Sequence, residues 1–294
     1  MQSLALSQGF ASLKRTIQIN RKGGYGVKKV LLKLAKAAGV AAFWLGIWAL
    51  ASFFVGKEVL LPSPISAGKA LLSLAATADF WISCATSLLR VCAGLLAGAV
   101  LGIATAALSL CSKTARSLLS PALSVIRATP VASFIILAFV WLSRGTIPIF
   151  TSSLIVLPVV WSSVTAAAGG IDKKLCEVAE VFRLPTQKRL RYIYIPSILP
   201  YFAQGLKTSL GMAWKAGVAA EVLCTPARSI GASLNGAKVY LETPAMFAWT
   251  AAVIILSMLL EYALGRLLTT VTEKYSQGAR EGSGKEEAEN AYSD

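Results

Sequence analysis

Histidine is absent from this 294-residue chain, and acidic residues are scarce, with 14 Asp and Glu against 29 Lys and Arg. The lack of histidine excludes histidine-based acid–base catalysis, histidine metal ligands and Ser-His-Asp triads. No cluster of Asp, Glu and Ser gathers in the sequence as a membrane-embedded enzyme would need. We therefore expect a non-catalytic chain without a metal site.

The cysteine pattern is equally uninformative for chemistry. The five cysteines stand at positions 84, 92, 111, 176 and 224 and show no Cys-x-x-Cys spacing. They imply no disulfide framework and are expected to act as small apolar fillers. We expect no cleavable signal peptide, because the first long apolar run begins near Ala37 and lacks a cleavage region.

What the chain does contain is apolar sequence. Hydrophobic residues make up 55%, and the mean hydropathy is +0.64, far above the composition of a soluble globular protein. We predict an all-α, polytopic membrane protein with six transmembrane helices. The expected spans are 37–56, 91–111, 118–142, 148–168, 201–222 and 245–264. The membrane domain would then cover 37–268, and the polar tail 269–294 is expected to be disordered.

Two spans carry particular signals. The third is interrupted by Arg127 and Pro130, and residues 57–86 before the second are expected to form an outer loop with one amphipathic helix. Within the second span, glycines recur at four-residue spacing, which allows another helix to approach closely and predicts a packing face. These glycines are Gly94, Gly98 and Gly102.

Basic residues are distributed asymmetrically. With the N-terminus inside, 20 of the 29 Lys and Arg lie in inner segments, six in outer segments and three within spans. The positive-inside rule therefore places both termini in the cytoplasm. The net charge of +15 is thus an orientation signal at a lipid membrane and not a sign of nucleic-acid binding. The basic segment 1–36 is expected to be either an amphipathic helix on the inner leaflet or a disordered tail.

The polar stretch 172–200 interrupts the apolar runs with six basic and three acidic residues. Its first part repeats apolar residues at the spacing of one helical face, which predicts a short amphipathic helix. These residues are Ile171, Leu175, Val178 and Phe182. Pro185 ends that helix, and a second short helix is expected from Thr186, closed by Pro196 and Pro200.

This stretch resembles the E-A-A-x3-G-x9-I-x-L-P signature of permease subunits of bacterial ABC importers. Glu177-Val178-Ala179 is followed, at the spacing of the signature, by position 183 and then by Ile193-Tyr194-Ile195-Pro196. Val178 and Ile195 are mild departures from it.

Arg183 is the departure that matters, because it stands where the signature has glycine. Glycine suits a left-handed bend between two short helices, whereas an arginine there is strained. We expect the bend either to be built differently, through Leu184-Pro185, or to alter the docking geometry.

The resemblance extends over roughly residues 58–268, to the permeases of the nitrate, sulfonate and taurine importer group. The segments LPSPISAGKAL, SLLRVCAGLLAGAVLGIATA, ATPVASFIILAFVWL and PYFAQGLKTSLGMAWKAGVAAEVL carry it. It implies a bacterial inner-membrane subunit that pairs with a second permease copy, docks a cytoplasmic ABC ATPase dimer and receives substrate from an external binding protein. The chain itself would need no cofactor, since ATP and Mg would be bound by the ATPase. The substrate would be a small anion such as nitrate, a sulfonate or taurine, or a vitamin precursor.

The resemblance also implies roles for individual residues. Val178, Ala179 and Phe182 are expected to enter a groove on the ATPase. Glu177 would pair with a basic residue there or cap its own segment. Ile193 and Pro196 would direct the chain back into the membrane. The full set of expected coupling residues is Glu177, Val178, Ala179, Phe182, Arg183, Leu184, Pro185, Ile193 and Pro196.

Ionisable residues in the fifth span are candidates for the translocation path, because such residues usually face a bundle interior or water. Lys207 lies near the inner boundary, where it could instead reach the headgroups. Lys215 lies deeper and would contact an anionic substrate or pair with a carboxylate such as Glu221 or Glu261. Glu221 is the third candidate.

Two other classes of protein remain as alternatives. A membrane enzyme would need the clustered acid, base or nucleophile that the sequence does not offer. A secondary carrier or channel without an ATPase partner would be expected to show repeated halves or broken helices in corresponding positions, and no repeat is evident.

Overall fold

The computed structural model describes residues 35–36 and 38–291, which are all-helical, with 85% helix and no strands. The expected all-α fold class is confirmed. The expectations for the basic segment up to residue 34 concern residues outside this range.

The first part of the described chain, up to Ala67, contains an apolar helix over Ala38–Val55. Two side chains near its end donate hydrogen bonds to the segment that follows. The indole Nε1 of Trp48 donates to the Pro62 carbonyl at 3.0 Å, and the Ser52 hydroxyl donates to the Leu61 carbonyl at 2.9 Å. These bonds hold that segment against the last turns of the helix.

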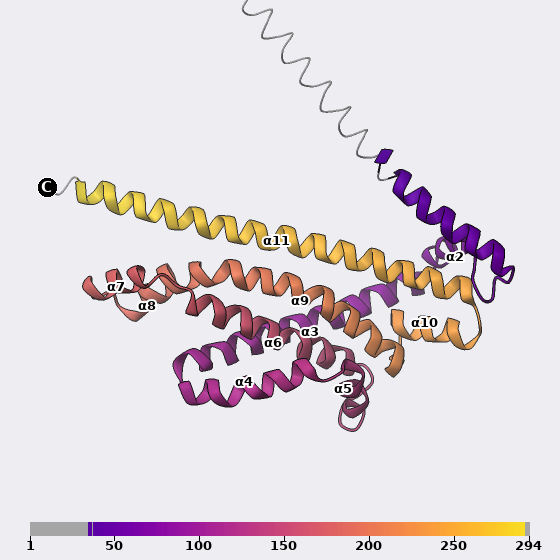
Figure 1. Cartoon of the computed structure of the whole chain (residues 1–294), viewed down its shortest axis with the longest axis horizontal. Coiled ribbons are helices and arrows are strands. Elements are labelled where there is room, and N and C mark those ends of the chain that lie inside the picture. Colours follow the sequence, from indigo (N-terminus) through magenta and orange to yellow (C-terminus); the bar gives the residue numbers. More distant parts are fainter. Residues whose placement is uncertain (1–34, 37, 292–294) are drawn as a thin grey trace, which may run out of the picture. The chain divides into compact units, whose positions relative to one another are not determined.

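The remaining elements are helices, joined mostly by short connections (Figure 1). They are α2 (Pro64–Ala75), α3 (Ala78–Cys111), α4 (Lys113–Ala128), α5 (Val131–Ala138), α6 (Ile147–Gly169), α7 (Lys173–Val181), α8 (Thr186–Arg189), the π-helix η1 (Leu190–Tyr194), α9 (Ile195–Cys224), α10 (Ile230–Val239) and α11 (Thr243–Ala291).

Four helices of the described chain are long and apolar enough to cross a membrane. They are Ala38–Val55, α3, α6 and the part of α11 over Thr243–Thr270. The pair α4 and α5 adds a fifth if it is counted as one broken span, with a bend of 99° between the two helices. The break falls at Thr129 and Pro130, since proline has no N–H to continue the helix.

Helix α3 begins at Ala78, well before the expected start of the second span at residue 91. The hydroxyl of Thr77 caps it by accepting from the Phe80 N–H, and Asp79 lies in the first turn, where a negative charge is favourable. The expected outer loop 57–86 is therefore shorter and contains α2 alone. Of the charged residues that suggested a loop, Lys69 lies in α2 and Asp79 in the first turn of α3.

Helices α3 and α6 pack closely along the glycine face of α3. A Cβ at Gly94 would lie 2.6 Å from the Ile149 carbonyl, and one at Gly98 would lie 2.6 Å from the Ser153 carbonyl. At Gly102 it would meet Val160 at 2.7 Å. These separations are shorter than carbon atoms tolerate, so this contact requires residues without side chains.

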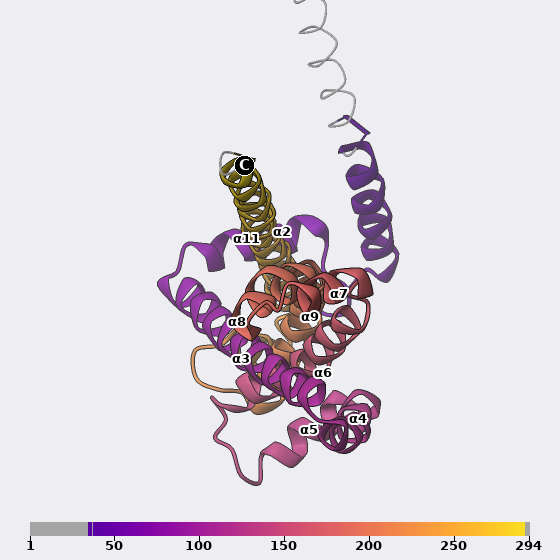
Figure 2. The ribbon, with the colours of Figure 1, turned by 90° about the vertical axis from the view of Figure 1, so that its left-hand side faces the viewer.

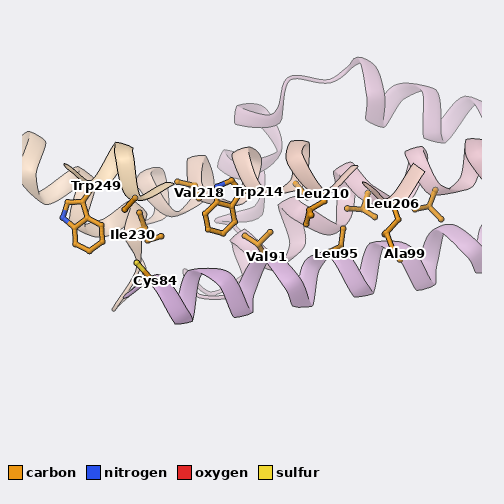
Figure 3. Close-up of a cluster of buried hydrophobic side chains, with 14 of the residues drawn as sticks. Cys84, Val91, Leu95, Ala99, Leu206, Leu210, Trp214, Val218, Ile230 and Trp249 are labelled. Atoms are coloured by element: carbon orange, nitrogen blue, oxygen red, sulfur yellow. The ribbon is translucent and has the colours of Figure 1, made fainter. Parts of the chain in front are cut away.

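Helix α9 packs along α6 and contributes the largest buried side chains of the core (Figure 3). Leu210, Trp214 and Val218 of α9 face Val91 and Leu95 of α3. The indole of Trp214 also donates to a carbonyl of α11 at 3.2 Å. Figure 2 shows the helices from the end at which α7 and α8 lie.

Helix α11 continues to Ala291, into the stretch 269–294 for which the composition predicts disorder. The sequence there is rich in Ala, Glu and Lys, which are good helix formers, although it also contains three glycines between 278 and 284.

Candidate functional site

The polar loop folds as a short helix, a bend and a second helix, as its sequence predicts. Helix α7 begins at Lys173 and is capped by Asp172, whose carboxylate accepts a hydrogen bond from the Lys174 N–H at 3.0 Å. Three apolar side chains at its C-terminal end are exposed, and we call them the α7 patch: Val178, Val181 and Phe182. Phe182 is the largest of them and is 73% exposed.

Two expected docking residues, Ala179 and Glu177, are not part of the α7 patch. We expected Ala179 to contact the ATPase together with Val178 and Phe182, but its side chain is only 1% exposed and faces the rest of its own chain. Consecutive helical residues are about 100° apart, so Ala179 is turned away from Val178 and toward the protein. Glu177 is exposed, and Glu180 forms an ion pair with Arg189 at 3.7 Å across the bend.

The bend is built at the signature position and has the geometry that a glycine would adopt. Arg183 has a φ of 47°, in the left-handed region. The Arg183 N–H donates to the Glu180 carbonyl and the Leu184 N–H to the Ala179 carbonyl, both at 3.0 Å. These two bonds form a Schellman motif, in which glycine normally occupies the position of Arg183. Arg183 therefore adopts the left-handed conformation for which glycine is suited at this position.

The second helix does not end at Pro196 and Pro200 as expected. Helix α8 passes into η1, which contains Ile193, and η1 passes directly into α9. The Ile195 N–H bonds to the Leu190 carbonyl, so the π-turn comes immediately before Pro196 in the first turn of α9. Pro200 lies inside α9. The loop is consequently joined to a membrane-length helix without any break.

Helix α9 presents polar side chains on its exposed face, among them Gln204, Thr208 and Lys215. Lys207 is also exposed but lies beside α11: a Cβ placed on Gly265 of α11 would be 3.8 Å from its Nζ. Glu261 lies one turn before Gly265 on α11 and approaches α9, since a Cβ placed on Gly211 would be 2.9 Å from its Oε1. Lys215 and Lys207 are thus both accessible, on neighbouring faces of the same helix.

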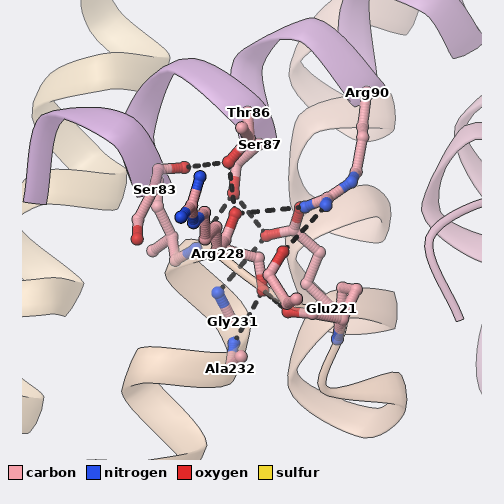
Figure 4. Close-up of polar contacts among 12 residues, drawn as sticks. Ser83, Thr86, Ser87, Arg90, Glu221, Arg228, Gly231 and Ala232 are labelled. Atoms are coloured by element: carbon pink, nitrogen blue, oxygen red, sulfur yellow. Dashed lines mark hydrogen bonds and ion pairs between the residues drawn. The ribbon is translucent and has the colours of Figure 1, made fainter. Parts of the chain in front are cut away.

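Glu221 is placed differently from the other two path candidates, because its side chain is completely buried (Figure 4). The Ser87 hydroxyl donates to Oε2 at 2.6 Å, the Gly231 N–H donates to Oε2 at 3.3 Å and Arg90 donates to Oε1 at 3.2 Å. We call these four residues the Glu221 network. Both carboxylate oxygens are occupied, so Glu221 does not line an open path, and its charged partner is Arg90 and not Lys215.

The network joins α3, α9 and the start of α10. Arg90 also donates to the Ala227 carbonyl at 3.0 Å, and the Ile230 N–H donates to the Ser87 hydroxyl at 3.0 Å. A Cβ on Gly231 would lie 2.3 Å from the Cβ of Glu221, so only glycine permits this approach. Sequence reasoning missed Ser87 and Arg90. The available signal was the position of Glu221 deep in an apolar stretch, where a carboxylate requires a partner.

These features describe a polytopic, all-helical membrane protein with an exposed amphipathic loop. In the described part of the chain, no group of three His, Cys, Asp or Glu residues lies close enough together to hold a metal. Sequence comparison identifies the class further. The chain belongs to the family of binding-protein-dependent transport system inner membrane components, which it matches over residues 98–274. This family contains the permease subunits of ABC transporters, so the resemblance seen in the sequence is confirmed.

Individual relatives fall in the expected group. The chain is 26% identical over 251 residues to the taurine transport system permease protein of Escherichia coli K12, covering 83% of this chain and 90% of that protein. It is 27% identical to a putative aliphatic sulfonates transport permease of Bacillus subtilis 168, covering 76% and 79%. A nitrate import permease of Synechococcus elongatus is 35% identical over 140 residues, 46% of each chain.

Solved structures share the fold at low sequence identity. A chain of an amino acid ABC transporter gives a TM-score of 0.52 at 15% identity, covering 64% of this chain and 90% of that chain. A chain of a methionine ABC transporter in an inward-facing conformation gives 0.52 at 16% identity, covering 65% and 93%.

Proposed function

We propose that this chain is the transmembrane permease subunit of an ATP-driven importer in a bacterial inner membrane. It works as a pair of copies with a cytoplasmic ABC ATPase, and it takes substrate from an external binding protein. The six-span arrangement belongs to this proposal. In it, α4 and α5 together form one broken span, and α9 forms a further, continuous span. The distribution of basic residues supports a cytoplasmic position for α7 and both termini.

The exposed α7 patch carries the proposal. Val178, Val181 and Phe182 lie in a loop too polar to enter lipid, so they are apolar surfaces exposed to water unless a partner covers them. A short helix with an apolar face suits a groove on a second protein. The family to which the chain belongs implies an ATPase as that protein.

Helix α9 supplies the connection to transport. Because η1 and α9 are continuous with α8, a movement of the loop is passed to the helix that carries Lys215. A lysine on the exposed face of a membrane helix is costly in lipid and is expected to face a water-filled path or the second copy. We propose that Lys215 contacts an anionic group of the substrate and that Lys207 packs at the interface between α9 and α11.

The substrate class follows from the same lysine and from the relatives. A small anion such as nitrate, or a sulfonate such as taurine, fits a path with a basic side chain and fits the printed substrates of the similar permeases. The alternative of a carrier or channel without an ATPase would leave the α7 patch without a function.

The experiment is copurification of the ATPase encoded with this permease, combined with ATP-dependent uptake. Phe182→Ala is expected to reduce both, because it removes the largest side chain of the patch. Tyr240→Ala is the matched control, since Tyr240 is 77% exposed and follows α10 on the opposite side of the membrane. Retention of the ATPase by Phe182→Ala at the level of this control would contradict the docking assignment.

A further inference from the structure

A second feature of the loop lies on its membrane side. An apolar groove of about 640 Å³ is enclosed by the ends of α3 and α6 and by the segment from α8 to the first turns of α9. Its volume lies within the range of small-molecule sites. Its walls include Ala107, Leu110, Val164, Leu190, Ile198 and Phe202.

The polar part of the groove is concentrated at one residue. Among the described residues that line it, Arg189 alone carries a charge, and Thr186 lies one turn before it. The guanidinium of Arg189 pairs with Glu180 at 3.7 Å, but Glu180 is largely exposed to solvent. An exposed ion pair of this kind contributes little free energy, so another anion can replace the carboxylate.

The groove is positioned where a span meets the polar loop. It lies beside Cys111, the last residue of α3, and beside Ile195, the first residue of α9. We place that level at the boundary between hydrocarbon and headgroups, because the predicted second span, 91–111, ends at Cys111. Apolar walls at this depth exclude water and are filled by hydrocarbon, while a basic side chain at the rim attracts a phosphate.

We propose that this groove binds one acyl chain of an anionic phospholipid, with the headgroup phosphate on Arg189. Lipid tails are as apolar as the groove walls, so the chain fills the space without selecting among lipids. Selection comes from the headgroup, because a lipid with net negative charge, such as phosphatidylglycerol, attracts Arg189 more strongly than phosphatidylcholine, whose ammonium group offsets its phosphate. The proposal rests on the proposed function only in assigning the groove to the inner leaflet.

The position of the lipid gives it an effect on coupling. Leu190 and Tyr194 of η1 line the groove, so a bound chain contacts the π-helix that joins the loop to α9. π-helices occur often at functional sites. Binding of the phosphate by Arg189 also releases Glu180 on α7, next to the α7 patch. Anionic lipid would therefore act on η1, the segment through which a movement of the loop reaches α9.

The test measures lipid binding to the purified full-length chain by native mass spectrometry. The chain in detergent is titrated with phosphatidylglycerol or phosphatidylcholine carrying identical acyl chains. We expect one site that prefers phosphatidylglycerol about fivefold, the factor given by one basic side chain near the phosphate. Arg189→Gln abolishes this preference. Arg191→Gln, an exposed arginine outside the groove lining, preserves it.

A second pair of variants tests the groove itself. Ala107→Phe fills the groove and is expected to remove the site for both lipids, whereas Ala104→Phe changes an exposed alanine of α3 outside the lining and keeps it. An undiminished preference in Arg189→Gln, or unchanged lipid binding in Ala107→Phe, overturns the proposal. If Ala107→Phe instead converts dimers to monomers with lipid binding intact, the second copy covers the groove and the proposal fails.

The lipid measurement is made without ATP, ATPase or substrate. Loss of ATPase docking in Phe182→Ala therefore leaves the lipid result standing. Conversely, if no lipid site is found, ATPase copurification still tests the proposed function.

Discussion

Arg183→Gly should stabilise the bend between α7 and α8. A left-handed conformation costs an L-residue about 1 to 2 kcal/mol, and glycine adopts it without that cost. Glycine in turn loses more backbone entropy on ordering, by roughly 0.4 to 1 kcal/mol. The balance favours Arg183→Gly by about 0.7 kcal/mol. Since the φ of 47° is accompanied by two intact backbone hydrogen bonds, the substitution changes strain and leaves the bonding pattern in place.

Hydrogen exchange of the Leu184 amide measures this directly, because that amide bonds to the Ala179 carbonyl only when the motif is closed. A gain of about 0.7 kcal/mol slows its exchange roughly threefold after correction for intrinsic rates. Arg183→Ala is the matched control, since it removes the same charge and side chain but retains the strain. If both variants change the exchange equally, the side chain of Arg183 determines the stability of the bend and the backbone argument is refuted.

Three further predictions concern the membrane part. Glu221→Ala should lower the free energy of unfolding by about 3 kcal/mol, because it leaves the guanidinium of Arg90, only 18% exposed, without its carboxylate partner. Denaturation in detergent measures this loss, and a loss below about 1 kcal/mol would contradict the Glu221 network. Gly98→Ala should cost about 1 to 3 kcal/mol through overpacking against α6, whereas Gly68→Ala, with open space around it, should be neutral or stabilising in thermal unfolding. Lys215→Gln should weaken uptake of an anionic substrate roughly tenfold in KM at unchanged protein level, and an unchanged KM would remove Lys215 from the path.

Local patterns predicted local structure well. The apolar periodicity after Asp172 predicted α7, since this signal depends only on neighbouring residues. Pro185 was expected to end it, but α7 ends at Val181, where the Schellman motif of Arg183 closes the helix. The signature position predicted a bend at Arg183. Whether an arginine could occupy a left-handed conformation there could not be read from spacing, because the surrounding hydrogen bonds decide it.

The errors in the sequence reading arise where distant residues meet. Helix α3 begins before the expected span, and its additional turns contain Ser87 and Arg90, which pair with Glu221 more than 130 positions away. The same pairing makes Glu221 a buried structural residue, although an isolated carboxylate in a span suggests a path. Ala179 shows the same limit, since the resemblance groups it with Val178 and Phe182 while packing buries it.

The continuity of α9 has a mechanical consequence for the Glu221 network. Thirty residues at 1.5 Å per residue make α9 about 45 Å long, with the loop at one end and Glu221 three residues from the other. A tilt of only about 5° around its midpoint displaces each end by about 2 Å, from the geometry of a rod of that length. The hydrogen bonds of Glu221 span 2.6 to 3.3 Å and do not survive such a displacement if their partners stay still. The beginning of α3, the start of α10 and the end of α9 must therefore swing together as one rigid body whenever the loop tilts α9.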